Sequence, residues 1–253
     1  MLLHEFDRYF KDLLHISDLE STDSSCNGLQ VARENDSITK VAFAVDACME
    51  SFKRAADWGA DMLFVHHGLF WGHVLPLTGT HFARVKFLLD NGIGLYAVHL
   101  PLDMHPDFGN NAGLAKQLRL KEIEPFGEYK GWKIGVKGLL PAPADIDGVL
   151  KALGILKQDC LGILPFGPRE IRSAGMISGG ATWEVLQAME ENLDLYITGE
   201  ISHQVYHHCL EGKINLIAGG HYQTETWGVR LLADKTAQDT GMETVFLDVP
   251  TGL

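Results

Sequence analysis

Residues 62–68 read Met-Leu-Phe-Val-His-His-Gly, a run of apolar residues that ends in two histidines and a glycine. A short apolar run bounded by turn residues predicts a buried strand. Two similar stretches flank it, at 40–45 and 95–98. The segments between them place apolar residues at helical spacing: Met49, Phe52 and Ala56 in one, Phe82, Val85 and Leu88 or Leu89 in the other. Such alternation predicts a mostly parallel sheet covered on both faces.

The ends of this first half also have recognisable patterns. Phe6, Phe10 and Leu13 or Leu14 predict an amphipathic helix over residues 1–15. A polar, serine-rich turn follows at 21–28, before the first strand of the alternating region. Residues 132–140 are strand-like and lead to Pro141 and Pro143, so we expect one half of the chain to pass to the other here.

The second half repeats the plan of the first. We predict strands at 174–177, 195–197 and 214–218, helices at 183–193, 202–212 and from about 225, and a closing strand at 243–249. Both halves are therefore α/β, with residues 1–126 in the first lobe and 127–253 in the second. The repeat is one of structural plan, with no clear repeat of residues beyond the polar segments described below.

Composition excludes several classes of protein. Hydrophobic residues make up 46% of 253 residues, which is typical of a globular chain with a core. No apolar run approaches the roughly 20 residues that span a bilayer, and the acidic start of the chain does not resemble a signal peptide. A net charge of −12 disfavours binding to nucleic acid or an anionic membrane. We expect a cytoplasmic protein whose four scattered cysteines are free thiols.

Three segments place metal-binding side chains directly after a predicted strand. They are His66-His67-Gly68, the stretch from His99 to Asp103, and the stretch from Gly219 to Glu225, which contains His221. Ligands of open α/β sheets bind beyond the carboxyl ends of the strands. His99 precedes Asp103 by four residues, and His221 precedes Glu225 by four. Two halves packed about a pseudo-twofold would bring these segments face to face.

Histidines and carboxylates without a thiolate favour Zn²⁺, Mn²⁺ or Fe²⁺ over Mg²⁺ or Ca²⁺. We therefore predict two divalent ions per chain, bound by His66, His67, Asp103, His221 and Glu225. Neighbouring residues of a strand point to opposite sides. His66 and His67 can nevertheless both be ligands if the chain turns at Gly68, or if each of them faces a different metal. Any single histidine after a strand is more often an ordinary polar residue, and the prediction depends on three such segments occurring together.

Other residues near these segments have weaker predicted roles. Glu200 follows a strand of the second half where His66 and His67 follow one in the first, so it is a candidate general base, although it could simply cap the next helix. His99 is a candidate either for a ligand or for a partner that orients Asp103, and His203 is a candidate for supporting the ligands. Three further pairs have lesser roles: His73 and His105 as substrate contacts, Phe70 and Trp71 as a stacking or packing wall, and His207 and His208 as solvent-facing residues.

The same segments resemble those of the Nif-three-like dinuclear-metal proteins (YbgI-like), whose members carry the name GTP cyclohydrolase 1 type 2 homologue. Residues 27–31, Asn-Gly-Leu-Gln-Val, and 198–200, Thr-Gly-Glu, add to the resemblance, which spans nearly the whole chain. It implies two intertwined α/β/α lobes, a toroidal homohexamer with metal sites facing an inner cavity, and the five metal ligands named above. This chain is too short for the long insertion that some members carry between the halves.

Two functions follow from these observations. The first is a metal-dependent hydrolase acting on a nucleotide or a related heterocycle or phosphate compound, because two metal ions can activate water near neutral pH. The sequence contains no phosphate-binding loop, dinucleotide fingerprint or Gly-x-Ser-x-Gly elbow, so the substrate stays open. The second is a non-catalytic metal-binding scaffold or adaptor ring. A nucleic-acid-binding ring is disfavoured by the acidic charge.

Overall fold

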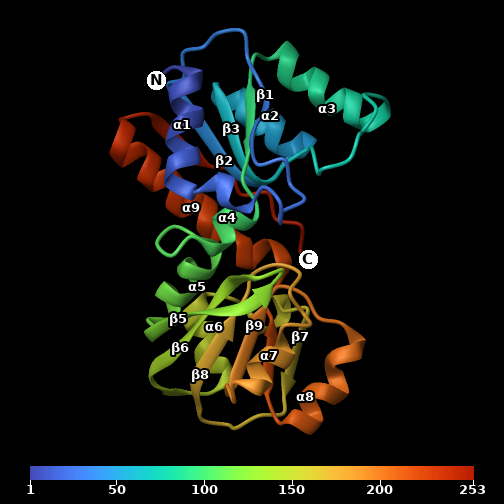
Figure 1. The fold of residues 1–253 in the computed structure, drawn as a ribbon, viewed down its shortest axis with the longest axis vertical. Helices are drawn as coiled ribbons and strands as arrows, with labels where there is room; N and C mark the ends of the chain where they lie inside the picture. Colours follow the sequence, from blue (N-terminus) through green and yellow to red (C-terminus); the bar gives the residue numbers. More distant parts are fainter. The chain divides into compact units, whose positions relative to one another are not determined.

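The structure is a computed structural model that describes residues 1–253 (Figure 1). The chain folds into two compact units: unit 1 is Met1–Leu102 with Val229–Val249, and unit 2 is Asp103–Gly228 with Pro250–Leu253. It thus leaves unit 1, builds unit 2 and returns, as the term intertwined implies. This division differs from the halves 1–126 and 127–253, because residues 103–126 belong to unit 2 and the end of the last helix and the last strand belong to unit 1.

Unit 1 contains a five-stranded sheet of order β1-β4-β3-β2-β11. Its strands are β1 (Gly28–Val31), β2 (Lys40–Asp46), β3 (Met62–His67), β4 (Gly94–Ala97) and β11 (Glu243–Phe246). Only β1 pairs antiparallel, at one edge. The mostly parallel sheet expected from residues 62–68 is therefore confirmed. The closing strand joins this sheet beside β2, although the sequence placed it in the second half.

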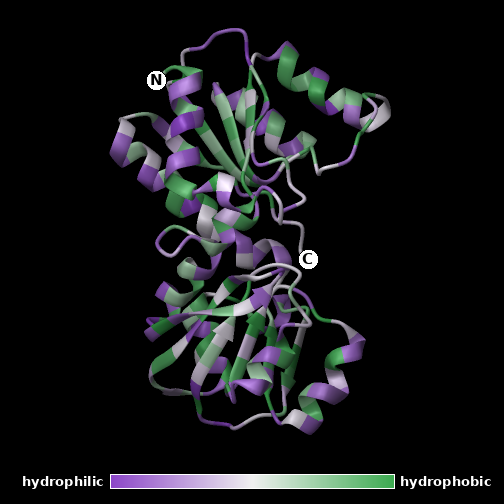
Figure 2. Cartoon of the chain, in the orientation of Figure 1, coloured by the Kyte–Doolittle hydropathy of each residue, from purple (hydrophilic) through white to green (hydrophobic).

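Helices cover both faces of the unit 1 sheet. The helices of this unit are α1 (Leu3–Leu14), η1 (Ile16–Leu19), α2 (Met49–Trp58), α3 (Gly79–Asp90) and the later part of α9 (His221–Thr240). On one face, Phe52 and Leu88 pack with alternate strand residues such as Leu63. On the other, Phe10 contacts Phe64 and Tyr96. Figure 2 shows the matching pattern, with largely hydrophobic strands and alternating colours along α1.

Unit 2 contains a six-stranded sheet of order β5-β6-β8-β9-β10-β7. Its strands are β5 (Lys121–Tyr129), β6 (Trp132–Ala144), β7 (Gly162–Pro165), β8 (Ile171–Met176), β9 (Leu195–Thr198) and β10 (Asn215–Ala218). Only β8, β9 and β10 pair parallel; the other three strands pair antiparallel. The sheet is therefore mixed, as expected for the α/β fold, with antiparallel partners that extend the parallel centre on both sides.

Helices also cover both faces of the unit 2 sheet. They are α4 (Leu100–Met104), whose later part lies in this unit, α5 (Asn110–Leu118), α6 (Ile146–Leu153), η2 (Lys157–Asp159), α7 (Val185–Glu190), η3 (His203–Val205), α8 (Tyr206–Gly212) and the start of α9. Leu114 and Leu150 pack on one face with Ile197. Val185 and Cys209 pack on the other. Both units are therefore α/β/α layers, as predicted. None of the helices in the structure is long and apolar enough to cross a membrane.

Each unit has an aspartate just before the middle strand of its parallel centre. In unit 1, Asp61 Oδ2 accepts hydrogen bonds from the backbone N–H groups of Thr39 (2.8 Å) and Lys40 (3.0 Å). In unit 2, Asp194 Oδ2 accepts them from the N–H groups of two residues of β8, at positions 172 (2.8 Å) and 173 (3.1 Å). Each aspartate thereby ties the start of one strand to the next. Asp61 and Asp194 thus have the same role in the two units, which extends the pseudo-repeat to single residues.

Candidate metal centre

The two histidines of the deciding stretch are the last residues of β3 rather than residues after it. His66 is fully buried, and its Nδ1–H donates to the carbonyl oxygen of Val98 at 3.0 Å. His67 is half-buried, and its Nδ1–H donates to Asp46 Oδ1 at 2.9 Å. Since carbonyl and carboxylate oxygens only accept, both rings are held as the tautomer whose Nε2 carries the lone pair that binds a metal.

The strand ends at His67 because the chain turns away at Gly68. A Cβ on this glycine would lie 2.4 Å from Gln30 Oε1 and 2.6 Å from the Ala97 Cβ, so no larger residue fits. Gln30 Oε1 instead accepts a hydrogen bond from the Leu69 N–H at 2.7 Å. Which of the two arrangements considered for His66 and His67 applies stays a prediction.

His99 is the third imidazole of unit 1. Its Nδ1–H donates to Asp23 Oδ1 at 2.9 Å, and the Asp23 side chain is only 1% exposed. Asp23 also accepts hydrogen bonds from Asn27 Nδ2 and from the Leu100 N–H. Burial alone would raise the pKa of Asp23, but the hydrogen bond and charge of His99, with the other donors, lower the pKa to about 2. Asp23 is thus a permanent anion that orients the ring.

These three imidazoles converge. Each of His66, His67 and His99 offers one ligand atom, and the three atoms lie within 4.8 Å of one another. Their ring centroids are 4.6 Å apart for His66 and His67, and 5.1 Å apart for His66 and His99. Unit 1 by itself therefore provides three nitrogen donors with a geometry suited to a cation. His99, predicted as either a ligand or a supporting residue, is a member of this group.

Unit 2 carries the two predicted carboxylate ligands. Asp103 in α4 is 7% exposed, and its Oδ1 accepts hydrogen bonds from Asn110 Nδ2 and Ser178 Oγ, both at 2.9 Å. Asn110 is itself buried and accepts from the Gly228 N–H at 2.7 Å. Donors from two side chains therefore fix the orientation of this carboxylate.

His221 and Glu225 form the other part of the unit 2 arrangement, one turn apart at the start of α9. His221 Nδ1 lies 2.7 Å from Glu200 Oε1, and its Nε2 lies 3.2 Å from Glu225 Oε2. Burial by itself lowers the pKa of His221, but hydrogen bonds and charges from Glu225 and Glu200 outweigh it and raise the pKa to about 9. The two carboxylates thus favour a positive charge at this point.

Gly179 makes room for Glu225. A Cβ at this position would lie 2.1 Å from Glu225 Oε1 and 3.1 Å from His221 Nε2. The residue also has a φ of +66°, which suits glycine. The donor set consists of imidazole nitrogens and carboxylate oxygens and includes no thiolate, so it fits Zn²⁺, Mn²⁺ or Fe²⁺.

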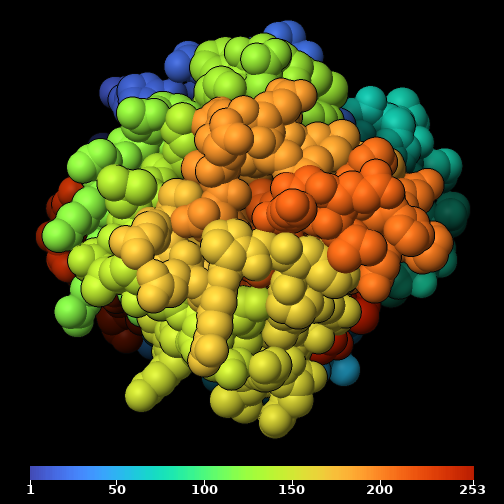
Figure 3. All heavy atoms as spheres, turned by 90° about the horizontal axis from the view of Figure 1, so that it is seen from below, coloured from blue at the N-terminus to red at the C-terminus, as the bar shows by residue number.

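The remaining candidates lie elsewhere or have other partners. His203, His207 and His208 are exposed, and α8 lies at the surface in Figure 3. His105 Nδ1 accepts hydrogen bonds from the N–H groups of the residues at 107 and 108. His73 is exposed, and its Nδ1 lies 2.9 Å from the carbonyl oxygen of residue 71. The solvent-facing positions predicted for His207 and His208 are confirmed.

Asp23, Asp46, Asn110 and Ser178 were not predicted from the sequence. Asp46 directly follows the apolar stretch at 40–45, so the rule that selected the histidines would have found it if applied to every strand. Asp23 lies in a polar turn and has no such pattern. Its role depends on a hydrogen bond across 76 positions of the chain.

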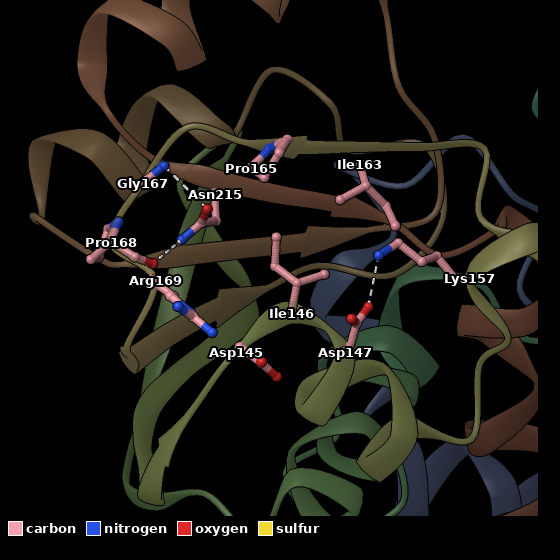
Figure 4. A pocket seen from close by; sticks show the side chains of 10 residues that line it. All are labelled: Asp145, Ile146, Asp147, Lys157, Ile163, Pro165, Gly167, Pro168, Arg169 and Asn215. Atoms are coloured by element: carbon pink, nitrogen blue, oxygen red, sulfur yellow. Dashed lines mark hydrogen bonds and ion pairs between the residues drawn. The ribbon is translucent and has the colours of Figure 1, made fainter.

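A separate cavity of about 410 Å³ lies at the edge of the unit 2 sheet (Figure 4). Its polar groups are largely engaged with one another: Lys157 pairs with Asp147 at 2.8 Å, and Asn215 binds the backbone of Gly167 and Pro168. No histidine lines it. This cavity therefore lacks the donors of a transition-metal site.

Known proteins resemble this chain in sequence and in fold over nearly its whole length. The chain matches the family model described as Duf34/NIF3 (NGG1p interacting factor 3) over residues 1–252. Proteins named GTP cyclohydrolase 1 type 2 homolog from Treponema pallidum (strain Nichols) and Archaeoglobus fulgidus are 43% and 42% identical to it, with both chains covered in full. Two solved structures are also similar over the full length of both chains: TTHA1606 from Thermus thermophilus (38% identity, TM-score 0.88) and ybgI, described as of unknown function (30%, 0.91).

Proposed function

Because the chain belongs to the Duf34/NIF3 family, we propose that it binds two divalent transition-metal ions through His66, His67, Asp103, His221 and Glu225 and acts as a metal-dependent hydrolase. The substrate class is a nucleotide or a related heterocycle or phosphate compound. The relatives named GTP cyclohydrolase 1 type 2 homolog support this class.

One observation carries the metal-binding part of the proposal. Four imidazoles, those of His66, His67, His99 and His221, each have Nδ1 held at 2.7–3.0 Å by an oxygen atom. Metal-binding histidines characteristically donate their second nitrogen to a carboxylate or backbone carbonyl, which fixes the ring and raises its basicity. Any buried imidazole N–H needs a partner, so the support for a metal centre comes from the convergence of three of these rings, those of His66, His67 and His99, whose ligand atoms lie within 4.8 Å of one another.

The candidate metal-binding segments lie close to the points where the chain passes from one unit to the other. His99 and Asp103 are four residues apart, and the division between the units falls directly before Asp103. The helix α4, Leu100–Met104, spans this division. In the same way α9 begins with His221 and Glu225 in unit 2 and continues into unit 1. The two helices that carry Asp103, His221 and Glu225 are therefore also the two that run from one unit into the other.

When bound, divalent ions supply Lewis acidity and lower the pKa of water toward neutrality. The residues of the chain do the remaining work. Asp46 and Glu200 orient His67 and His221, while Asn110 and Ser178 hold Asp103. The hydrogen bond to His221 supports a positioning role for Glu200. Its predicted role as a general base stays a prediction.

A non-catalytic metal-binding scaffold or adaptor is the second candidate. The family description, an interacting factor, favours it, because that name refers to association with another protein. Metal-dependent turnover separates the two functions. If the ion-loaded protein hydrolyses nucleotides or phosphate esters and loses this activity with a chelator, the hydrolase is supported; stoichiometric ion binding without turnover supports the scaffold.

Metal content is the first experiment. Protein purified without chelator or affinity-tag metal should contain about two ions per chain by mass spectrometry. Glu225→Ala in unit 2 and His67→Ala in unit 1 should each lose most of this content, whereas His208→Ala on exposed α8 should keep it. Wild-type protein that stays empty after addition of Zn²⁺, Mn²⁺ or Fe²⁺ would contradict the proposal. Loss of one ion by only one variant would show that the two units bind ions separately.

We also propose that the chain forms a homohexamer, as the resemblance implies. Unit 1 exposes several large apolar side chains around α3: Val74 (94%), Leu77 (54%), Phe82 (50%) and Leu89 (59%). Exposed apolar side chains in one segment of the chain are candidates for a contact between copies. Light scattering at the exit of a sizing column tests this proposal, and a monomeric mass would overturn it.

A further inference from the structure

A second feature of unit 1 lies beside His99. Glu20, residues 23–27, Trp71 and Gly72 line a cavity of about 560 Å³. It adjoins the candidate centre through two of its walls. Asp23 holds the His99 ring, and the Trp71 indole stands edge-on to that ring with centroids 5.0 Å apart. Anything bound in this cavity would therefore lie next to an imidazole of the centre.

The walls of the cavity are fixed before any ligand binds. Gln30 Nε2 donates to the Cys26 carbonyl at 2.9 Å, and the Cys26 N–H donates to the Phe70 carbonyl at 3.0 Å, which ties the two loops together. Trp71 Nε1 donates to the Gly68 carbonyl at 3.0 Å, so the edge of the indole is used and its plane is set. A preorganised aromatic wall binds planar groups at low entropic cost.

One buried polar atom of the cavity has no partner. Ser25 is 8% exposed, yet its Oγ makes no hydrogen bond in the structure. That oxygen is closed off from solvent by the surrounding protein, so it offers no hydrogen bond to a ligand in the open cavity. Asp23, in contrast, is fully engaged with His99, Asn27 and backbone N–H groups.

The charge of the lining selects against anions. Glu20 and Asp23 are acidic, and no lysine or arginine lines the cavity. The Asp23 carboxylate is 1% exposed and engaged with His99, so Glu20 is the acidic group that a triphosphate would meet, with no lysine or arginine in the lining to compensate it. An uncharged heterocycle instead gains from stacking on Trp71.

We propose that this cavity is the substrate subsite of the centre and binds an uncharged nitrogen heterocycle of the nucleobase type, with any phosphate lying outside it. The proposal rests on the proposed function, because it assigns the cavity to the substrate of that centre. It names the part of the substrate that the protein recognises and excludes phosphate recognition by these loops.

Calorimetric titration of the metal-depleted full chain tests the subsite without the ions. Guanosine or adenosine should bind, and inorganic triphosphate should not. Trp71→Ala should weaken nucleoside binding about tenfold, because stacking of one base on an aromatic side chain contributes about 1–3 kcal/mol and about 1.4 kcal/mol is tenfold. Trp71→Phe should retain most of the affinity and controls for folding. Trp183→Ala, at a 46% exposed tryptophan of unit 2, should have no effect.

A second measurement uses the exposed thiol of the same cavity. Nucleoside should slow alkylation of Cys26 several-fold, as measured by mass spectrometry of peptides, while the half-buried Cys160 of unit 2 reacts at an unchanged rate. The proposal is overturned if neither nucleoside binds, if Trp71→Ala binds as tightly as wild type, if triphosphate binds better than nucleoside, or if Cys26 is not protected. These results are independent of metal content, so failure of the subsite and failure of the metal centre are distinguishable.

Discussion

The parallel strands of the two units share a backbone plan but carry different side chains at equivalent positions. Counted from the paired aspartates, His67 follows Asp61 by six residues and Glu200 follows Asp194 by six. One strand earlier, Asp46 follows Lys40 by six residues and Gly179 follows Ser173 by six. In unit 1 the pair is thus an aspartate beside a histidine; in unit 2 it is a glycine beside a glutamate.

This difference shows how one plan provides both ligands and their supports. In unit 1 the first strand supplies the support, Asp46, and the second supplies the imidazole, His67. In unit 2 the second strand supplies the support, Glu200, for an imidazole that begins the following helix. The equivalent position after the first strand there is Gly179, which has no side chain, and Glu225 occupies the space that it leaves. The position after the second strand thus supplies an imidazole in unit 1 and a support in unit 2.

The largest expected effect comes from filling that space. Gly179→Ala adds a methyl group 2.1 Å from Glu225 Oε1 at a residue whose φ is +66°. We expect about 2–4 kcal/mol lower free energy of unfolding, from strain and the displaced carboxylate together, and metal content below about a tenth of wild type. Urea denaturation and mass spectrometry measure the two quantities.

The control for Gly179→Ala is Gly131→Ala in the β5–β6 turn, where φ is +86° and no atom lies within 4 Å of the added Cβ. This variant carries the backbone strain without the clash, so it should be less stable but keep its metal. If both variants retain metal equally, the space beside Glu225 is not needed for the site.

Removing the unit 1 support has the next largest effect. Asp46→Ala frees the His67 ring, and loss of such a partner typically weakens metal binding by about 10–100-fold. The Asp46 side chain is 34% exposed, so stability should change little. Competition with a chelating dye measures the affinity. Asp90→Ala, at an exposed aspartate of α3 paired with Lys86, is the control, and equal affinities for the two variants would refute the role of Asp46.

Some strands of the fold could be predicted from the sequence and others could not. The parallel centres of both sheets were predictable because their strands are short apolar runs separated by helical spacing, as residues 62–68 show. The strands β1, β5 and β7 were not, because edge strands are partly exposed and lack that pattern. The return of the chain to unit 1 through β11 depends on pairing between residues about 200 positions apart, which local periodicity does not encode.

The five predicted ligands could be found from local sequence patterns, whereas the residues that support them could not. Histidine or acid after an apolar run is a local pattern, and it selected His66, His67, Asp103, His221 and Glu225. The supports are defined by contacts instead. Asp23 reaches His99 across 76 positions, and Ser178 reaches Asp103 across 75. Their residue types are common in loops, so only the folded arrangement identifies them.

A smaller effect is expected from Glu200→Gln. The amide oxygen can still accept the hydrogen bond from His221 Nδ1, but the charge is lost, so metal affinity should fall only several-fold. Glu200→Ala removes the acceptor as well and should approach the effect of Asp46→Ala. If Gln and Ala at position 200 weaken metal binding equally, the charge rather than the hydrogen bond supports His221, and the parallel with Asp46 is weaker.

The smallest effect concerns the paired aspartates that define the comparison. Burial alone would raise the pKa of Asp61, but backbone and side-chain hydrogen bonds from Thr39, with Lys40 and the charge of Arg33, lower it. A carboxyl whose folded pKa is lowered adds stability above its unfolded pKa, about 3.9, and this stability is lost as pH falls through the folded pKa. Asp61→Asn should therefore reduce the free energy of unfolding by about 1 kcal/mol at pH 7.

Urea denaturation at a series of pH values tests this sign. The difference between wild type and Asp61→Asn should be constant near neutrality and shrink in strong acid, where the wild-type carboxyl is protonated and resembles the amide. Asp194→Asn in unit 2 should cost a similar amount at pH 7, because Asp194 also accepts two backbone hydrogen bonds at the start of a strand. A difference for Asp61 that stays the same at every pH would mean that hydrogen-bond geometry, not charge, is what the two units share at this position.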